Sequence, residues 1–152
     1  MRSQFLALLA EVHGKMGQAD EGLIVLSEAL ASVDKTGERR WEAELYRLKG
    51  ELTLQRFQAS SSKFPITESQ YLRADPQCEA EACFLKAVEV ACRQKAKSLE
   101  LRATTSLARL LRDTGRRDET RAMLAEIYSW FTEGFDTADL KDAKMLLDEL
   151  SK

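Results

Sequence analysis

The hydrophobic pattern is most regular between Lys97 and Phe131, where apolar residues recur at intervals of three and four, the spacing of one helical face. These positions are Leu99, Ala103, Leu107, Ala108, Leu110 and Leu111, followed by Ala122, Met123, Leu124, Ile127, Tyr128 and Phe131. Between the two sets, Gly115 can adopt the left-handed conformation that ends a helix. Asp118 and Glu119 then supply the negative charge that the first turn of a helix favours. The stretch therefore predicts a helical hairpin, which cannot bury both of its faces alone.

Earlier parts of the chain match this hairpin. A shift of 40 followed by one of 58 aligns three positions of the second helix: Thr120, Ala80 and Gly22; Leu124, Phe84 and Leu26; Ile127, Ala87 and Ala29. For the first helix the order of the shifts reverses, aligning Ala108 with Gly50 and Gly50 with Ala10. Both results agree with a period of 40 and one insertion of 18 residues between Gly50 and Ala80. The segment 57–76 in that gap holds a serine triplet and both prolines, so we predict that it is a loop.

The glycine turn and the small-x-x-x-bulky-x-x-small pattern that follows it resemble the tetratricopeptide repeat (TPR), most closely between Leu9 and Leu30. The resemblance implies an all-α superhelix of about three antiparallel hairpins. The period of 40 exceeds the usual ~34 and implies longer helices. In a TPR superhelix the first helices of the hairpins line an inner groove that holds an extended or helical peptide.

Three runs also resemble the C-terminal repeat region of large bacterial signalling proteins: Trp41–Leu52, Glu79–Leu110 and Tyr128–Leu150. Those proteins join a class III adenylate/guanylate cyclase-type domain, an ATPase module and a TPR tail. The resemblance implies a cytoplasmic, non-catalytic scaffold for protein–protein interaction or intramolecular regulation. It also implies that the catalytic and nucleotide-binding parts lie upstream, so no catalytic or cofactor-binding residue is assigned here.

We expect a single domain, 1–152, with repeats at about 2–37, 38–95 and 97–133 and a capping helix at about 137–151. The predicted helices are 3–15, 18 or 19 to 33, 38–56, 77–94, one on each side of Gly115, and 138–150. Gly37 is predicted to close the connection that follows the second helix, Gly134 to end the helix after Gly115, and Asp136 or Thr137 to cap the last helix. That helix has an apolar face of Leu140, Ala143, Leu147 and Leu150 and a charged face of the kind that closes a repeat stack. The N-terminal hairpin has no such cap, which is consistent with a fragment or with a homodimer formed through this hairpin.

Composition narrows the choice of function. No apolar run approaches the ~20 residues of a transmembrane helix, so we expect no membrane partner and a cytoplasmic protein. The net charge of −2 argues against a general nucleic-acid binder. However, residues 86–121 hold ten Lys or Arg against five Asp or Glu, and a nucleic-acid-binding regulatory domain using this basic surface is the alternative function. Solvated helix faces would explain the same charges.

Candidate chemistry is sparse. His13, the only histidine, occupies a repeat position where a large side chain packs between helices. Cys78, Cys83 and Cys92 lack the C-x2-C spacing of metal sites, so we predict reduced, partly buried thiols and no metal centre. Glu42 and Glu44 are two residues apart on a helix, so they are predicted to be surface charges rather than an acid–base pair.

The repeat register instead points to the inner face of the first helices. The candidate peptide-groove residues are Glu11, Lys15, Arg47, Glu51, Arg102, Arg109 and Arg112. Guanidinium groups bind carboxylates in a bidentate manner, so we hypothesise that the last three arginines receive an acidic segment or a C-terminal carboxylate of a protein partner. Alternatively, these arginines solvate their helix or pair with local acids.

Overall fold

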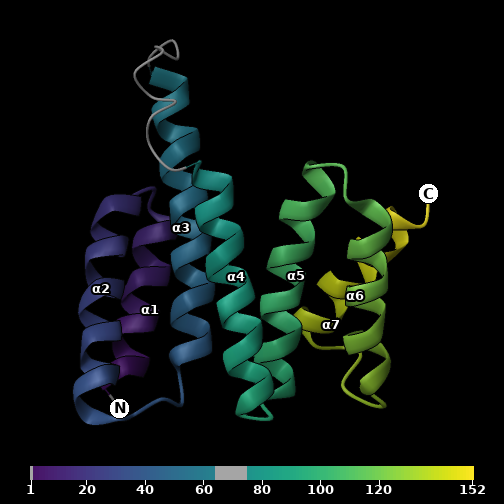
Figure 1. Cartoon of the computed structure of the whole chain (residues 1–152), viewed down its shortest axis with the longest axis horizontal. Helices are drawn as coiled ribbons and strands as arrows, with labels where there is room; N and C mark the ends of the chain where they lie inside the picture. Colours follow the sequence, from purple (N-terminus) through teal and green to yellow (C-terminus); the bar gives the residue numbers. More distant parts are fainter. Residues whose placement is uncertain (1, 64–74) are drawn as a thin grey trace.

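The computed structural model describes residues 2–63 and 75–152, which form seven α-helices (Figure 1). In chain order they are α1 (Arg2–Lys15), α2 (Ala19–Thr36), α3 (Glu42–Lys63), α4 (Pro76–Arg93), α5 (Lys97–Asp113), α6 (Arg117–Trp130) and α7 (Ala138–Leu150). The two described ranges contain no strand, which confirms the predicted all-α class. No helix in these ranges combines the length and the apolar character needed to cross a lipid bilayer.

The helices pack as three hairpins, α1 with α2, α3 with α4, and α5 with α6, and α7 packs against α5 and α6. We call α1, α3, α5 and α7 the A helices, because each contacts the next one along the chain, and α2, α4 and α6 the B helices. In the described part of the chain, each B helix contacts only the A helices before and after it. Figure 1 shows the hairpins side by side in chain order, with α7 behind α5 and α6.

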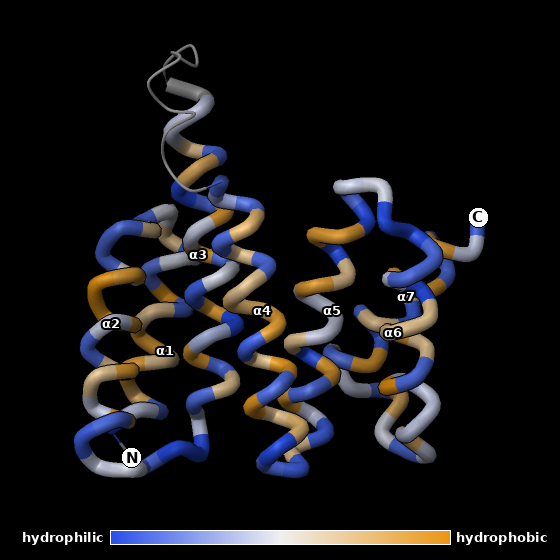
Figure 2. The backbone as a smooth tube through the Cα atoms, in the orientation of Figure 1, coloured by the Kyte–Doolittle hydropathy of each residue, from blue (hydrophilic) through white to orange (hydrophobic). Residues whose placement is uncertain are grey.

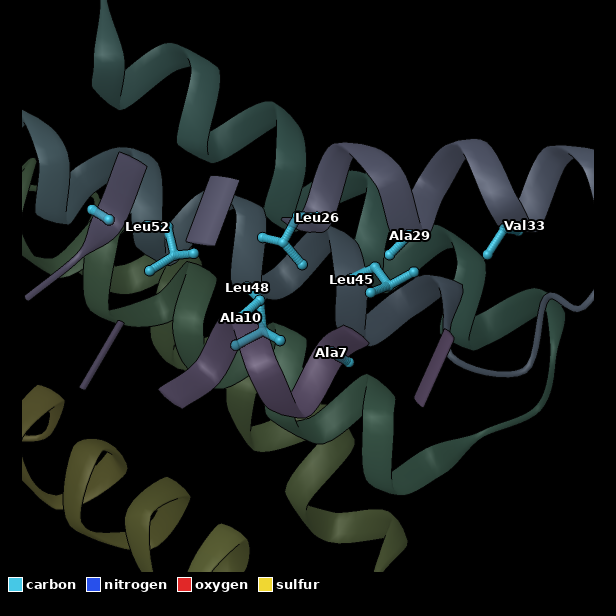
Figure 3. Close-up of a cluster of buried hydrophobic side chains, with 9 residues drawn as sticks. Ala7, Ala10, Leu26, Ala29, Val33, Leu45, Leu48 and Leu52 are labelled. Carbon is cyan, nitrogen blue, oxygen red and sulfur yellow. The ribbon is translucent and has the colours of Figure 1, made fainter. Parts of the chain in front are cut away.

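The positions aligned by the two shifts are buried in all three hairpins, with a bulky residue of the B helix packed against small residues of the A helix. They are Ala10, Gly50 and Ala108 on the A helices, and Gly22, Leu26, Ala29, Ala80, Phe84, Ala87, Thr120, Leu124 and Ile127 on the B helices. Figure 3 shows the first of these cores, in which Leu26 and Ala29 of α2 meet Leu45, Leu48 and Leu52 of α3. Figure 2 shows that the turns between helices are largely hydrophilic.

Enlarging Ala108 to leucine should lower the free energy of unfolding by about 1–3 kcal/mol, because the added methyl groups have no space in a packed interface. Ala108 is fully buried against Leu124 and Ile127 of α6. Ala122→Leu provides the control, because Ala122 is exposed on α6 although its spacing placed it on the apolar face. Chemical denaturation of both variants tests this, and an unchanged stability of Ala108→Leu would show that the register is wrong.

The predicted loop 57–76 is wrong over its first part, because α3 continues to Lys63 instead of ending at Arg56. In Figure 1 the end of α3 stands beyond the neighbouring helices. Ser60 and Ser61 donate their hydroxyl hydrogen bonds to the carbonyl oxygens of Arg56 and Phe57, four residues earlier, so these serines satisfy their polar groups inside a helix. Residues 64–74 of the predicted loop lie outside the described residues.

The other end of that segment also belongs to a helix. Pro76 occupies the first turn of α4, where its missing N–H is not needed. Asp75 caps this helix by accepting a hydrogen bond from the backbone N–H of Gln77. The serines and Pro76, two of the features that favoured a loop, therefore lie inside helices.

Among the remaining boundaries, the final helix has the predicted bounds, with Thr137 at its N-cap. Gly37 ends α2 in the left-handed conformation, after the helix has continued three residues beyond Val33. The prediction that Gly134 ends α6 is wrong, because Phe131 already adopts an extended conformation and stops the helix at Trp130. Leu146 rather than Leu147 is fully buried on the apolar face of α7.

Candidate functional site

The A helices carry a connected hollow surface, which we call the A face. A hollow of about 280 Å³ is lined by five of the predicted groove residues: Glu11, Lys15, Arg47, Glu51 and Arg102. A neighbouring hollow of about 100 Å³ shares Arg47 and Arg102 and adds Arg109. Arg112 lies outside both hollows, near the C-terminal end of α5. Six of the seven predicted residues are thus brought together by α1, α3 and α5.

Arg47 lies at the centre of the A face. Its Nε and Nη2 donate to the two carboxylate oxygens of Glu44 at 3.0 and 2.7 Å, and Nη1 donates to Glu51. Burial alone would lower the pKa of this guanidinium, but the hydrogen bonds and charges of Glu44 and Glu51 outweigh it and raise the pKa above its usual value. Arg47 and Glu44 side chains are only 8% and 5% exposed, so this pair is part of the core.

Two contacts tie α5 to this pair. Arg102 places Nη1 2.9 Å from the Glu44 oxygen that Arg47 also contacts, so one buried carboxylate serves two guanidinium groups. Ser106 donates its hydroxyl hydrogen bond to Glu51 at 2.8 Å. The prediction that Glu44 and Glu42 are surface charges is therefore wrong. Both are buried: Glu44 meets Arg102 of α5, and Glu42, on another side of α3, pairs with Arg39 of the α2–α3 connection.

Acidic residues of α7 approach the three arginines of α5. Asp139 lies 3.6 Å from Arg102, Asp142 lies 3.6 Å from Arg109, and Glu149 lies 2.6 Å from Arg112. Arg112 also pairs with its neighbour Asp113. The arginines are therefore paired, but of the predicted local acids only Asp113 takes part, and the other carboxylates come from α3 and α7.

The α1 end of the A face is more open. Lys15, 75% exposed, pairs with Glu11 at 2.9 Å, and the hydrogen bond between them is the main cause that lowers the pKa of Glu11. Gln55 of α3 lines the same hollow and donates from Nε2 to the carbonyl oxygen of Gly14, which joins α3 to the end of α1. The face is therefore of mixed charge at α1 and α3 and rich in arginine at α5.

Sequence reasoning missed the acidic partners on this face. Glu44, Arg47 and Glu51 are spaced at three and four residues on one helix, and this spacing could have indicated an ion-pair cluster. Asp139 and Asp142 gave no comparable signal, because their partners are more than 30 residues away in the chain.

A third hollow, of about 600 Å³, lies away from the A face and was also not predicted. It lies where the α2–α3 and α4–α5 connections meet, and its lining includes Arg39, Arg40, Trp41, Gln94 and Leu99. Gln94 donates from Nε2 to the carbonyl oxygen of Arg39 at 2.6 Å, and Arg39 pairs with Glu42. The Gln94–Arg39 contact holds the two connections together, so the hollow is a consequence of how the connections before and after the second hairpin meet.

The histidine and the cysteines occupy ordinary environments. His13 is half-buried and forms a 2.9 Å hydrogen bond from Nδ1 to Gln18, so it closes the α1–α2 turn as well as packing. All three cysteines are free thiols, but Cys78 and Cys92 are exposed, against the prediction of partial burial. The carboxylate of Asp75 raises the pKa of Cys78. The described residues contain no cluster of potential ligands that could hold a metal ion.

Comparison of the chain with protein-family models, with curated proteins and with solved structures found no match.

Proposed function

We propose that this chain is a TPR-like helical-repeat scaffold whose A face binds an acidic segment of a protein partner, or of the same protein in intramolecular regulation. The observation that carries the proposal is the convergence of Glu11, Lys15, Arg47, Glu51 and Arg102 on one hollow across three A helices. The order of contacts, A helix to A helix with each B helix between them, supports a superhelix of this type. We infer binding rather than catalysis, because the acids around Arg47 are committed to it as ion-pair partners.

The ion pairs on the A face differ in how readily a ligand could replace them. Arg47 and Glu44 are buried, so separating them would leave a charge unpaired in the core. Arg109 and Asp142 are about half exposed and 3.6 Å apart. Such exposed pairs contribute about 0–1 kcal/mol, so an incoming carboxylate can take the place of Asp142 at little loss. Arg109 is therefore the proposed anchor for the ligand, and Arg47 holds the face together.

The acidic residues of α7 indicate the spacing of carboxylates that a ligand would need. Asp139 and Asp142, three residues apart on one helix, meet Arg102 and Arg109 on the facing helix. An acidic helix or extended segment can offer carboxylates at a comparable spacing. The resemblance to cyclase–ATPase–TPR proteins implies a bacterial cytoplasmic signalling system, and we include this setting in the proposal.

The proposal predicts that a fluorescein-labelled peptide of alternating Glu and Leu binds the chain and that its Gln–Leu analogue binds more weakly. Reversing the charge at Arg109 (Arg109→Glu) should weaken binding by about tenfold, because a repulsive contact replaces an attractive one. Fluorescence anisotropy of the labelled peptide measures both effects.

Lys86→Glu is the matched control. Lys86 is comparably exposed and is also ion-paired, with Glu89, but it lies on α4 outside the hollows of the A face. Its reversal should leave peptide affinity within about twofold. Equal losses for both variants would indicate a general charge effect, and no loss for Arg109→Glu would contradict the proposed groove.

Nucleic-acid binding through residues 86–121 remains the alternative proposal, and it has less support. Six of the ten basic side chains there pair with carboxylates: Lys86, Lys97, Arg102, Arg109, Arg112 and Arg116. Such pairing reduces the positive potential that attracts phosphates. A steep fall of oligonucleotide affinity with salt would favour this alternative, since each phosphate contact releases counterions.

A further inference from the structure

One face of α1 is apolar and exposed, at the opposite end of the stack from α7. Phe5, Leu8 and Val12 of α1 are 68%, 55% and 50% exposed, and the exposed Met16 follows at the same spacing in the turn after the helix. Their spacing of three and four residues places them on a single stripe of the helix. We call these four residues the α1 stripe. A continuous apolar stripe on a helix marks an interaction surface more often than scattered exposed apolar residues do.

The corresponding positions on the other A helices show what covers such a stripe. The shifts of 40, 58 and 40 carry Phe5, Leu8 and Val12 onto three further sets: Leu45, Leu48 and Leu52; Ala103, Ser106 and Leu110; Ala143, Leu146 and Leu150. All nine of these residues are buried, each set facing the preceding hairpin. In Figure 3, Leu45, Leu48 and Leu52 meet Leu26, Ala29 and Val33 of the B helix α2. The α1 stripe is the one set of the four that no B helix in the described residues covers.

The charges at the helix ends indicate in which direction a helix covering the α1 stripe would run. The covering B helices α2, α4 and α6 have acidic residues in their first turns. Two ion pairs place these ends toward the C-terminal parts of the A helices that follow: Asp20 pairs with Arg56, seven residues before the end of α3, and Glu81 pairs with Arg116 in the turn after α5. The last turn of α1 is likewise basic, with His13 and Lys15. An acidic first turn of a covering helix would therefore meet complementary charge at this end of α1.

We propose that the α1 stripe is the docking site for an amphipathic helix of another protein that mimics α2. This helix has an acidic first turn, an apolar line at the spacing of Gly22, Leu26, Ala29 and Val33, and an antiparallel orientation to α1. A second copy of this chain fits less well. Antiparallel pairing of two α1 helices would bring the basic last turn of each to the first turn of the other, which has no acid. The proposal does not depend on peptide binding at the A face.

The test uses the full chain and a fluorescein-labelled synthetic peptide with the sequence of residues 18–37, which contains α2. We expect saturable binding by anisotropy, with affinity in the range of about 1–100 μM for one helix on one apolar stripe. A peptide carrying Leu26→Lys should bind at least about tenfold more weakly, because its central apolar anchor is lost.

Val12→Lys in the full chain should weaken binding by about tenfold, while Leu85→Lys on α4 should change it by less than about twofold. Val12 and Leu85 are matched in exposure, at 50% and 51%, so neither change disturbs the core. Circular dichroism confirms that both variants fold. Absence of binding at about 1 mM peptide, or equal binding to the Val12→Lys variant, would overturn the proposal. Light scattering that shows a dimer dissociated by Val12→Lys would overturn it in favour of self-association.

Discussion

Replacing Phe84 with alanine should lower the free energy of unfolding by about 3–5 kcal/mol, which is the usual loss for a fully buried aromatic side chain. Phe84 is 1% exposed and lies at the centre of the core that joins α3, α4 and α5. Its ring lies so close to Gly50 that a Cβ atom added there would come within 2.6 Å of a ring carbon. Because α3 approaches closely at this glycine, no side chain of α3 can move into the space left by the ring at that point.

Urea denaturation followed by circular dichroism measures this change. Phe57→Ala is the control, since Phe57 lies on α3 and is 39% exposed, so its truncation should change stability by less than about 1 kcal/mol. A loss below 1 kcal/mol for Phe84→Ala would mean that α3 and α4 do not pack through this contact. Loss of stability matters for function as well, because this core fixes α3 and α5, which carry most of the A face.

Replacing Arg47 with methionine should lower the free energy of unfolding by about 3 kcal/mol, because it removes one partner of a buried ion pair. Methionine keeps much of the apolar stem of arginine, so the loss reports on charge more than on packing. After the change Glu44 keeps one cationic partner, Arg102 at 2.9 Å, and Glu51 keeps the hydroxyl of Ser106. The carboxylate of Glu44 then remains buried with only one of its two guanidinium partners.

A double variant separates the two contributions. Changing Glu44 to glutamine together with Arg47 to methionine removes both charges of the buried pair, and buried pairs exchanged for neutral groups usually lose little stability. The two charges left behind keep partners, since Arg102 retains Asp139 and Glu51 retains the hydroxyl of Ser106. We therefore expect the double variant to be more stable than Arg47→Met alone. If both variants are equally destabilised, packing of the arginine stem rather than charge accounts for the loss. In either case Arg47 is a structural residue of the A face, whereas Arg109 is the proposed anchor of a ligand.

Much of the fold could be predicted from spacing alone. Leu26, Phe84 and Leu124 stand at corresponding points of the three hairpins, and all are buried as their periodicity indicates. The bounds of the last helix were also predictable, because Thr137 begins it and its apolar face repeats at three and four residues. The apolar face of a helix is set by the spacing of residues close in sequence, which is why these positions are visible there although their contacts come from other helices.

The length of α3 was less predictable. A serine triplet favours loops on average, because serine hydroxyls compete with the backbone for hydrogen bonds. In this chain the hydroxyls of Ser60 and Ser61 bond to carbonyl oxygens one turn earlier, so the same side chains are compatible with a helix. Composition cannot distinguish these two outcomes, because it does not show which acceptor each hydroxyl meets.

In the candidate site, as in the fold, some features could be predicted from the sequence and others could not. The sequence by itself determined which residues share one side of the A helices, because the repeat register aligns Glu11, Glu51 and Arg109 on successive A helices. Only the tertiary structure decided their partners: it buried Glu44 between two arginines, placed Asp142 against Arg109, and left Val12 exposed where Leu52 and Leu110 are covered. Periodicity specifies the face on which a side chain lies. The partners of that face, whether charged or apolar, come from helices distant in the chain. They are therefore decided only when the helices pack together.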